Sequence, residues 1–240
     1  MLATVSAFPG VLRVGDLEIA VSISDRRKNV RLTVERDASI TAVVPPQVAR
    51  SELIKMVEAK RSWLYGKLAE RRELGEARPA REYVAGEGFP YLGRSYRLRM
   101  VEPGNEVRLI RGRLELGSSG GAPELVRWYC RVGEPWLKRR IGPWASRMGL
   151  DVTGLRVQPL GYRWGSCSRD GRINIHWATM QLPPTLIDYV LVHELAHLRQ
   201  RGHSNEFWQL IERTMPGYEN HRERLRHLGP DLWMPDKDDE

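Results

Sequence analysis

The sequence contains little of what marks a secreted or membrane protein. Its only cysteines are Cys130 and Cys167, which excludes a framework of disulfide bonds. No apolar run approaches the roughly 18 residues that a membrane-spanning helix requires. Residues 1–14 lack a basic start followed by a long apolar core, so no secretory signal is expected. These absences predict a cytoplasmic protein without a membrane segment.

The chain also lacks internal repeats and long low-complexity segments. With 41% hydrophobic and 28% charged residues among 240, its composition is ordinary for one large or two small folded domains. Its mixture of alternating and helical apolar patterns predicts an α+β fold. We expect a β-rich N-terminal subdomain with a long helix over 1–80, a short-stranded connecting part over 81–121, a third part over 122–235 and an acidic tail over 236–240.

Apolar patterns locate individual elements within these parts. The strands before Pro45 are expected to pair antiparallel, and one amphipathic helix is expected from Val48 to about Leu74. Residues 123–148 predict a helix or a helix pair, interrupted at the glycines and prolines of 133–135 and 142–143. Further short strands are predicted within 91–116, at 155–157 and at 173–177.

Positive charge is in excess, with a net charge of +8. Between Arg127 and Arg147, basic residues alternate with aromatic ones, a mixture that can bind single-stranded nucleic acid by charge and stacking. The same pattern fits an amphipathic helix pair whose tryptophans face the core and whose arginines face water. We favour the helix pair and keep nucleic-acid binding as an alternative.

The most informative stretch is His193-Glu194-Leu195-Ala196-His197, which matches the zinc-peptidase pattern H-E-x-x-H. Residues four apart lie on one face of a helix, so both imidazoles can reach one ion. Glu194 lies about a quarter-turn away, where its carboxylate can reach a water molecule rather than the ion. The alternative is a buried helix with two incidental histidines.

The residues around the motif argue against coincidence. The run from Leu186 to Leu198 is apolar nearly all round, which predicts a buried helix. Burying a glutamate and two histidines in such a helix is costly unless they are paired or bind a metal. Thr185 and Asp188 fit a capping box at the start of this helix.

A catalytic zinc usually takes three protein ligands, and His203 is our candidate for the third. On a straight helix His203 would lie about 15 Å along the axis from His193, so the helix must end between His197 and His203. Gly202 is placed to end it in the left-handed conformation, and Ser204 can cap a following helix. The competing candidates for the third ligand are Glu206, His221 and His227.

The motif belongs to a longer series of short stretches with a specific order and spacing. They are Arg163–Ser168, Gly171–Ile175, Ile187–Val190, His193–Leu198, His203–Ser204, Phe207–Trp208 and Met215–Pro216. This series resembles the YgjP-like metallopeptidase family, which is related to the SprT-like zincins. Weaker similarities, at Val44-Pro45, Lys60–Leu64 and Tyr91–Tyr96, extend the resemblance roughly from the twenties to about residue 230. His176 departs from the family pattern, which has an asparagine there.

The resemblance implies a zinc-dependent hydrolase that cleaves peptide bonds, with a zincin-like catalytic part over 122–235. In such folds an edge strand beside the motif helix can bind extended peptide. Arg172–Met180 is a candidate for this role, and an ordinary internal strand is an equally favoured alternative. The other functions considered are a nucleic-acid-associated protein with a zinc site, including a DNA-recruited protease, and a hydrolase of a non-peptide amide.

Roles follow for the residues of the predicted site. Glu194 is the predicted general base, and His193, His197 and His203 are the predicted zinc ligands. Arg163, Tyr218 and His176 are candidates for stabilising the oxyanion. The predicted substrate-binding residues are Trp164, Asn174 and His176.

Overall fold

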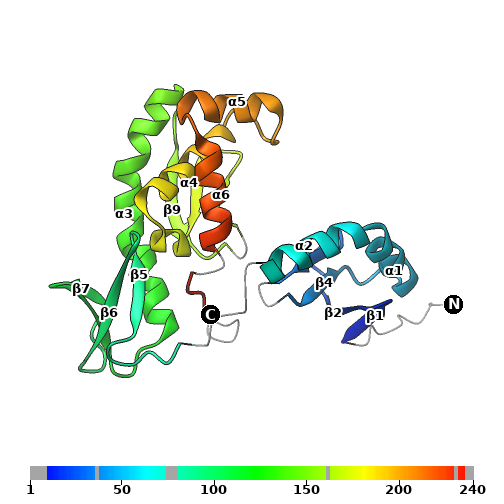
Figure 1. Cartoon of the computed structure of the whole chain (residues 1–240), viewed down its shortest axis with the longest axis horizontal. Coiled ribbons are helices and arrows are strands. Elements are labelled where there is room, and N and C mark those ends of the chain that lie inside the picture. Colours follow the sequence, from blue (N-terminus) through cyan, green and yellow to red (C-terminus); the bar gives the residue numbers. More distant parts are fainter. Residues whose placement is uncertain (1–9, 36–37, 74–80, 161–162, 230–231, 236–240) are drawn as a thin grey trace. The chain divides into compact units, whose positions relative to one another are not determined.

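The computed structural model describes residues 10–35, 38–73, 81–160, 163–229 and 232–235 (Figure 1). The chain divides into two compact units, Met1–Arg78 and Pro79–Glu240, and each has its own hydrophobic core. The predicted acidic tail, 236–240, lies outside the described residues. The boundary predicted at residue 121 stays a prediction, and one core cluster draws residues from both sides of it. Helices and mixed sheets together make an α+β protein.

The first unit is a four-stranded sheet with two helices. Its elements are β1 (Val11–Val14), β2 (Leu17–Ile23), β3 (Arg31–Val34), β4 (Ile40–Val44), α1 (Arg50–Ala59) and α2 (Arg61–Glu73). The strand order is β1-β2-β4-β3, and β2 pairs parallel with β4. The prediction of antiparallel pairing is therefore wrong for this pair. Alternating apolar residues identify the buried face of a strand but do not fix the direction of its neighbour.

The single long helix predicted after Val48 is also wrong, because the helix breaks at Lys60. The Lys60 N–H is shared between the carbonyls of Met56 and Val57, each at 3.1 Å, which tightens the last turn of α1. The chain then restarts as α2, and Leu53 on α1 and Leu64 on α2 are both fully buried in one core.

The second unit contains two further sheets. The first has the order β5-β6-β8-β7, and the second has the order β10-β11-β9. Their strands are β5 (Gly88–Tyr91), β6 (Arg94–Val101), β7 (Arg108–Ile110), β8 (Arg113–Gly117), β9 (Gly154–Gln158), β10 (Gly165–Cys167) and β11 (Arg172–His176). In the second sheet, β11 pairs parallel with β9 and antiparallel with β10.

The position of β11 corrects the predicted edge strand. The chain leaves the strand at His176 and continues as a 3-10 helix, η1 (Trp177–Gln181). β11 lies in the middle of its sheet, so the edge-strand role given to Arg172–Met180 is wrong. The edge beside the motif helix is β10, which packs against it. β10 escaped prediction because Gly-Ser-Cys is short and has no β-branched residue.

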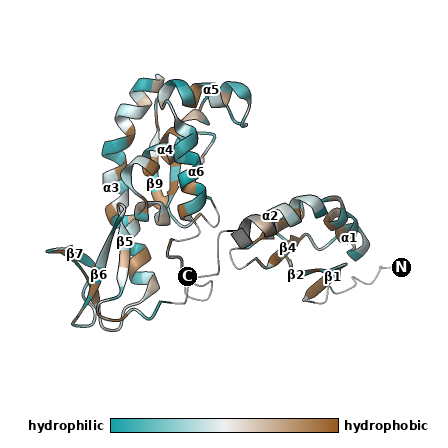
Figure 2. Cartoon of the chain, in the orientation of Figure 1, coloured by the Kyte–Doolittle hydropathy of each residue, from teal (hydrophilic) through white to brown (hydrophobic). Residues whose placement is uncertain are grey.

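One continuous helix, α3 (Ala122–Met148), runs along the second unit beside β9 (Figure 1). The predicted interruptions are wrong, although Pro135 and Pro143 both lie inside the helix. Figure 2 shows hydrophobic and hydrophilic residues alternating along it. Leu137 and Ile141, between the two prolines, are buried in the core, and this packing outweighs the local cost of proline.

Three helices complete the second unit. The motif helix is α4 (Pro184–Ala196), followed by α5 (Asn205–Thr214) and α6 (Tyr218–Leu228). After α6, Trp233 packs edge-on against Phe89 and Trp177, with ring centroids 4.9 and 5.3 Å apart. Gln181 fixes this segment, since its side-chain nitrogen donates to the Trp233 carbonyl at 2.7 Å and its oxygen accepts from the Trp233 N–H at 3.0 Å. None of the described helices is both long and apolar enough to cross a membrane.

A partly buried ion pair attaches α4 to α3. Asp188 accepts hydrogen bonds from Arg140 Nε at 2.5 Å and Nη2 at 2.8 Å, and from Trp144 Nε1 at 3.1 Å. The predicted capping box is therefore wrong: Pro183 is the N-cap, and it makes no side-chain cap. Arg140 also lies 4.9 Å from the centre of the Trp136 ring. The basic and aromatic residues of α3 thus contact one another and α4. The expected helix pair is a single helix, and Arg140 bonds to Asp188 instead of facing water.

We expect Asp188→Ala to lower the free energy of unfolding of the second unit by about 1–2 kcal/mol, because it leaves a partly buried guanidinium and an indole N–H unpaired. The measurement is urea unfolding followed by tryptophan fluorescence, since Trp63 is the only tryptophan before Pro79. Glu134→Ala, which removes a more exposed ion pair with Lys138, is the control and should cost less than about 0.5 kcal/mol. Equal losses in the two variants would contradict this account.

Candidate metal centre

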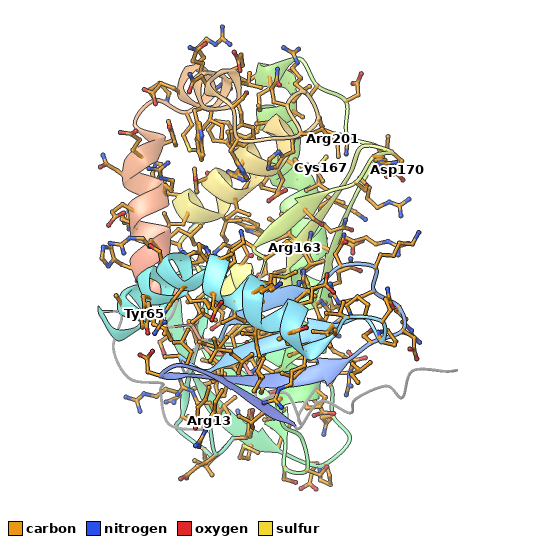
Figure 3. The ribbon with its side chains drawn as sticks, turned by 90° about the vertical axis from the view of Figure 1, so that its right-hand side faces the viewer. Arg13, Tyr65, Arg163, Cys167, Asp170 and Arg201 are labelled. Carbon is orange, nitrogen blue, oxygen red and sulfur yellow. The ribbon has the colours of Figure 1, made fainter. Side chains whose placement is uncertain are left out.

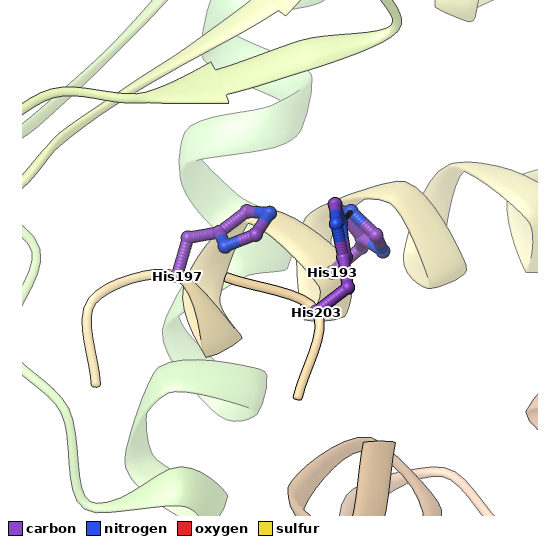
Figure 4. Close-up of side chains that lie close together, drawn as sticks. All are labelled: His193, His197 and His203. Carbon is purple, nitrogen blue, oxygen red and sulfur yellow. Dashed lines mark hydrogen bonds between the residues drawn. The ribbon is translucent and has the colours of Figure 1, made fainter. Parts of the chain in front are cut away.

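Three histidines converge at the C-terminal end of the motif helix (Figure 4). One nitrogen from each of His193, His197 and His203 lies within 4.8 Å of the others. The Nε2 atoms of His193 and His203 are 3.1 Å apart. His193 and His197 are half-buried, and His203 is exposed. The structure therefore brings together the three residues that the sequence predicted as ligands.

The turn after α4 brings His203 back toward the helix. α4 ends at Ala196, and the N–H groups of Leu198 and Arg199 bond to the carbonyls of Leu195 and Ala196 at 3.0 and 3.1 Å. Gly202 does not adopt a positive φ, so its predicted left-handed role is wrong. The following helix begins as predicted, with the Ser204 hydroxyl accepting from the Phe207 N–H at 3.4 Å.

The Phe207 ring packs against all three imidazole rings. Its ring centre lies 5.0 Å from that of His193, 4.6 Å from that of His197 and 4.8 Å from that of His203. The side chain is fully buried. The same turn of α5 therefore caps the helix through Ser204 and supports the imidazole cluster.

The protonation state of the cluster fits a bound cation. Burial lowers the pKa of His193 to about 3, with a further contribution from His197 and His203. Burial also lowers the pKa of His203, and His197 adds to that shift. His197 Nδ1 lies 2.9 Å from the Gln200 carbonyl; as a donor to it, the ring keeps the lone pair on Nε2. Metal ligation requires such neutral imidazoles.

The donor set of the cluster also fits a shared cation. His193 and His203 turn their Nε2 atoms toward each other, and no carboxylate of the described residues joins the group. A shared cation would give the clustered nitrogens a partner that the described protein does not provide. Among the described residues, only these three histidines form such a group of possible ligands. The competitors lie elsewhere: Glu206 accepts from Ser204, and His227 contacts Glu223 at 2.8 Å.

Glu194 lies beside the histidines and is only 6% exposed. Burial raises the pKa of Glu194 to about 7, and the Arg163 guanidinium opposes this shift. Gly165 on β10 provides the space for this side chain, because a Cβ there would lie 2.6 Å from Glu194 Cγ and 2.8 Å from its Oε1. A carboxyl group with this pKa can exchange a proton near neutral pH.

These groups line one pocket of about 590 Å3. Its wall includes Trp164, Ser166, Cys167 and Arg163, with Tyr189 on the motif helix. Burial raises the pKa of the Cys167 thiol, which gives it the character of an ordinary half-buried cysteine.

Residues 28–228 match a family model described as YgjP-like, metallopeptidase domain. The chain belongs to the YgjP-like family. This confirms the resemblance drawn from the motifs and makes the protein, at the level of its family, a metal-dependent peptidase. Among solved structures, the chain is similar to the crystal structure of the metallopeptidase zymogen of Pyrococcus abyssi abylysin, with 26% identity, 37% of this chain and 90% of that chain covered, and a TM-score of 0.35. No curated protein matches the chain.

Not all residues predicted for this YgjP-like site reach the pocket. Tyr218 is 7% exposed and stacks between Tyr189 and Trp208, outside the pocket wall. His176 is 2% exposed, and its Nδ1 accepts from the Ala178 N–H at the start of η1. Asn174 lies behind the edge strand and donates to Ser166 Oγ at 3.4 Å. Asn174 therefore contacts a pocket residue without lining the pocket itself.

Other pocket residues were not predicted from the sequence. Gly165 was recognised only as part of a motif, because its role depends on a side chain from a distant helix. Arg201 was not singled out as a site residue, and α6, which carries Arg222 and Arg226, was not predicted. A helix over 218–228 would have placed those two arginines on one face.

We expect His203→Ala to weaken zinc binding by more than about 100-fold, because removing a group that only hydrogen-bonds a ligand costs up to about 100-fold and losing a ligand should cost more. Glu206→Ala and His221→Ala are matched controls, because neither residue joins the histidine group. Zinc retained after dialysis against graded chelator is the measurement. Stoichiometric zinc in His203→Ala, together with loss in either control, would overturn the assignment of the third ligand.

We expect Gly165→Ala to reduce kcat/KM by about 100-fold, because the added methyl group displaces the Glu194 carboxyl. Zinc content should not change. Gly202→Ala is the control, since a Cβ at that glycine meets nothing within 4 Å. Kinetics on a cleaved peptide and zinc analysis would be run on both variants. Full activity in Gly165→Ala would show that this close contact does not position Glu194.

Proposed function

We propose that this protein is a zinc-dependent peptidase in which Glu194 acts as the general base. The observation that carries the proposal is the histidine group next to a buried carboxyl, in a pocket bounded by an edge strand. Three imidazoles favour zinc over the harder cations, which prefer oxygen ligands. When bound by His193, His197 and His203, zinc would act as a Lewis acid on the scissile carbonyl and activate water for attack.

In this proposal Glu194 moves the proton. Its carboxylate takes a proton from the attacking water and returns it to the leaving amine, so that the group ends each cycle as it began. Its low exposure keeps bulk water away from the transfer. Gly165 supports the role, because its lack of a side chain leaves the space that the Glu194 carboxyl occupies.

We further propose that substrate binds as an extended strand along β10. β10 has one neighbour in its sheet, β11, and its residues Gly165, Ser166 and Cys167 line the pocket. An edge of this kind can hydrogen-bond an added peptide strand through its backbone. Trp164, which comes directly before β10 in the pocket wall, is the proposed substrate-binding side chain.

For the oxyanion, we propose Arg163 rather than Tyr218 or His176. Arg163 is exposed, lines the pocket and acts electrostatically on Glu194. Tyr218 and His176 are both buried outside the pocket wall. A guanidinium aimed at a developing negative charge would stabilise the transition state without itself changing charge.

We expect Glu194→Gln to keep zinc and fold but to lose at least about 100-fold in kcat, because the amide cannot accept the proton. Cleavage of a diverse denatured-protein library, with zinc analysis on the same samples, is the measurement. Turnover equal to that of the wild type would rule out Glu194 as the base.

The pH dependence provides a second test of the same role. The base must be deprotonated, so kcat/KM should rise with pH through the pKa of Glu194. That pKa is about 7 without an ion, and a nearby dication favours the carboxylate and lowers it. The acid limb in zinc-loaded protein should therefore have its midpoint below 7. A midpoint clearly above 7 would contradict this assignment.

A further inference from the structure

Four arginines line the same pocket as the histidines and Glu194. Arg163 precedes β10, Arg201 follows α4, and Arg222 and Arg226 lie four residues apart on α6. We call these four residues the arginine collar. All are exposed, and Figure 3 shows Arg163 and Arg201 on the side of the second unit where Cys167 lies.

The positive charge of the collar is largely unneutralised. Among the described residues of the pocket wall, Glu194 is the only acidic one. Arg226 forms an ion pair with Glu223 at 2.7 Å. Arg163, Arg201 and Arg222 have no ion-pair partner within the part of the chain that the structure describes. A cation held by the three histidines would add to this positive field.

Arg222 is held in place without using its hydrogen-bond donors. Its guanidinium carbon lies 5.2 Å from the centre of the Trp208 ring. Trp208 in turn stacks on the buried Tyr218, with centroids 5.4 Å apart and planes 13° from parallel. A cation–π contact uses the face of the guanidinium, so its N–H groups stay available to a ligand.

What distinguishes the collar is its convergence on one pocket. Among the described arginines of the second unit outside the pocket, some form ion pairs, such as Arg127 with Glu124 and Arg140 with Asp188, and others form none. The four collar residues, in contrast, line the same wall as the histidine group and Glu194. Three unpaired guanidiniums therefore lie beside the proposed catalytic groups.

We propose that the arginine collar selects peptides that carry a carboxylate close to the scissile bond. This inference rests on the proposed peptidase function and names its substrate class. Arginine binds carboxylates through paired N–H donors, and a partly enclosed pocket strengthens such contacts. The carboxylate comes from an aspartate or glutamate side chain or from the C-terminus of the peptide.

A peptide fits this pocket better than a nucleic acid does. Single-stranded nucleic acid binds proteins by stacking its bases on open aromatic faces. Trp164 is the one indole in the described pocket wall, and it is half-buried. Trp208, the ring that holds Arg222, already contacts His203 and Tyr218. β10, by contrast, offers an open backbone edge in the same pocket wall.

The test compares fluorescent peptides that differ only in Glu, Gln or Lys beside the cleaved bond, each with a free or an amidated C-terminus. Binding is measured by polarisation with zinc-loaded Glu194→Gln protein, and cleavage is measured with the wild type. We expect the Glu peptide to bind about tenfold more tightly than the Gln peptide, and the Lys peptide to bind least. If the Gln peptide binds more tightly with a free than with an amidated C-terminus, the collar also binds the C-terminal carboxylate of the peptide.

Collar variants then show whether the arginines cause this preference. Arg222→Gln and Arg201→Gln, each made in the Glu194→Gln background, should remove most of the difference between the Glu and Gln peptides. Arg224→Gln is the matched control, because Arg224 is exposed on the same helix but outside the pocket wall. The preference should also survive removal of zinc by a chelator, which separates the collar from carboxylate binding to the ion.

The outcomes separate the two proposals. Cleavage without a carboxylate preference would overturn the collar inference and leave the peptidase intact. An absence of cleavage would count against the peptidase, while peptide binding would still decide the role of the collar. A preference that persists in Arg222→Gln and Arg201→Gln would overturn the collar. So would an oligonucleotide that binds more tightly than every peptide and loses that binding in Arg222→Gln.

Discussion

The site depends on the burial of ionisable groups in a helix that is otherwise apolar. Burial raises the pKa of Glu194 to about 7 and lowers that of His193 to about 3, so both shifts favour the uncharged form. Neutral imidazoles can coordinate a cation, and a carboxyl near its midpoint can exchange a proton. The close contact of Gly165 and the loop that returns His203 enclose these groups, and the Arg163 charge only partly opposes the rise in the pKa of Glu194.

The motif helix carries two buried acids in contrasting environments. Asp188 is fixed by Arg140 and Trp144, and this contact holds α4 against α3. Glu194, on the same helix, has no ion pair among the described residues. The Asp188 carboxylate holds two helices together, and the Glu194 carboxyl stays available for proton transfer. The positive charge that could have neutralised Glu194 instead lies around the pocket wall, where a substrate can meet it.

The sequence predicted what depends on local geometry. The spacing of His193 and His197, the helix end before His203 and the Ser204 cap all follow from the dimensions of one helix turn. Features that depend on distant parts of the chain were missed or wrong. The parallel pairing of β2 and β4, the continuity of α3 through its prolines and the edge position of β10 are decided by packing between elements. The collar was missed for the same reason, since it assembles only when α6 folds against α4.

The contact between Gln181 and Trp233 has a consequence for the order in which the core of the second unit can form during translation. Trp233 fills a space between Phe89 and Trp177, residues that leave the ribosome long before it. The histidine motif is therefore translated before this aromatic cluster can close. A chain made only as far as residue 232 would contain every proposed catalytic group but lack the ring that packs against Phe89 and Trp177. The last indole of the sequence thus completes a cluster whose other members come from much earlier in the chain.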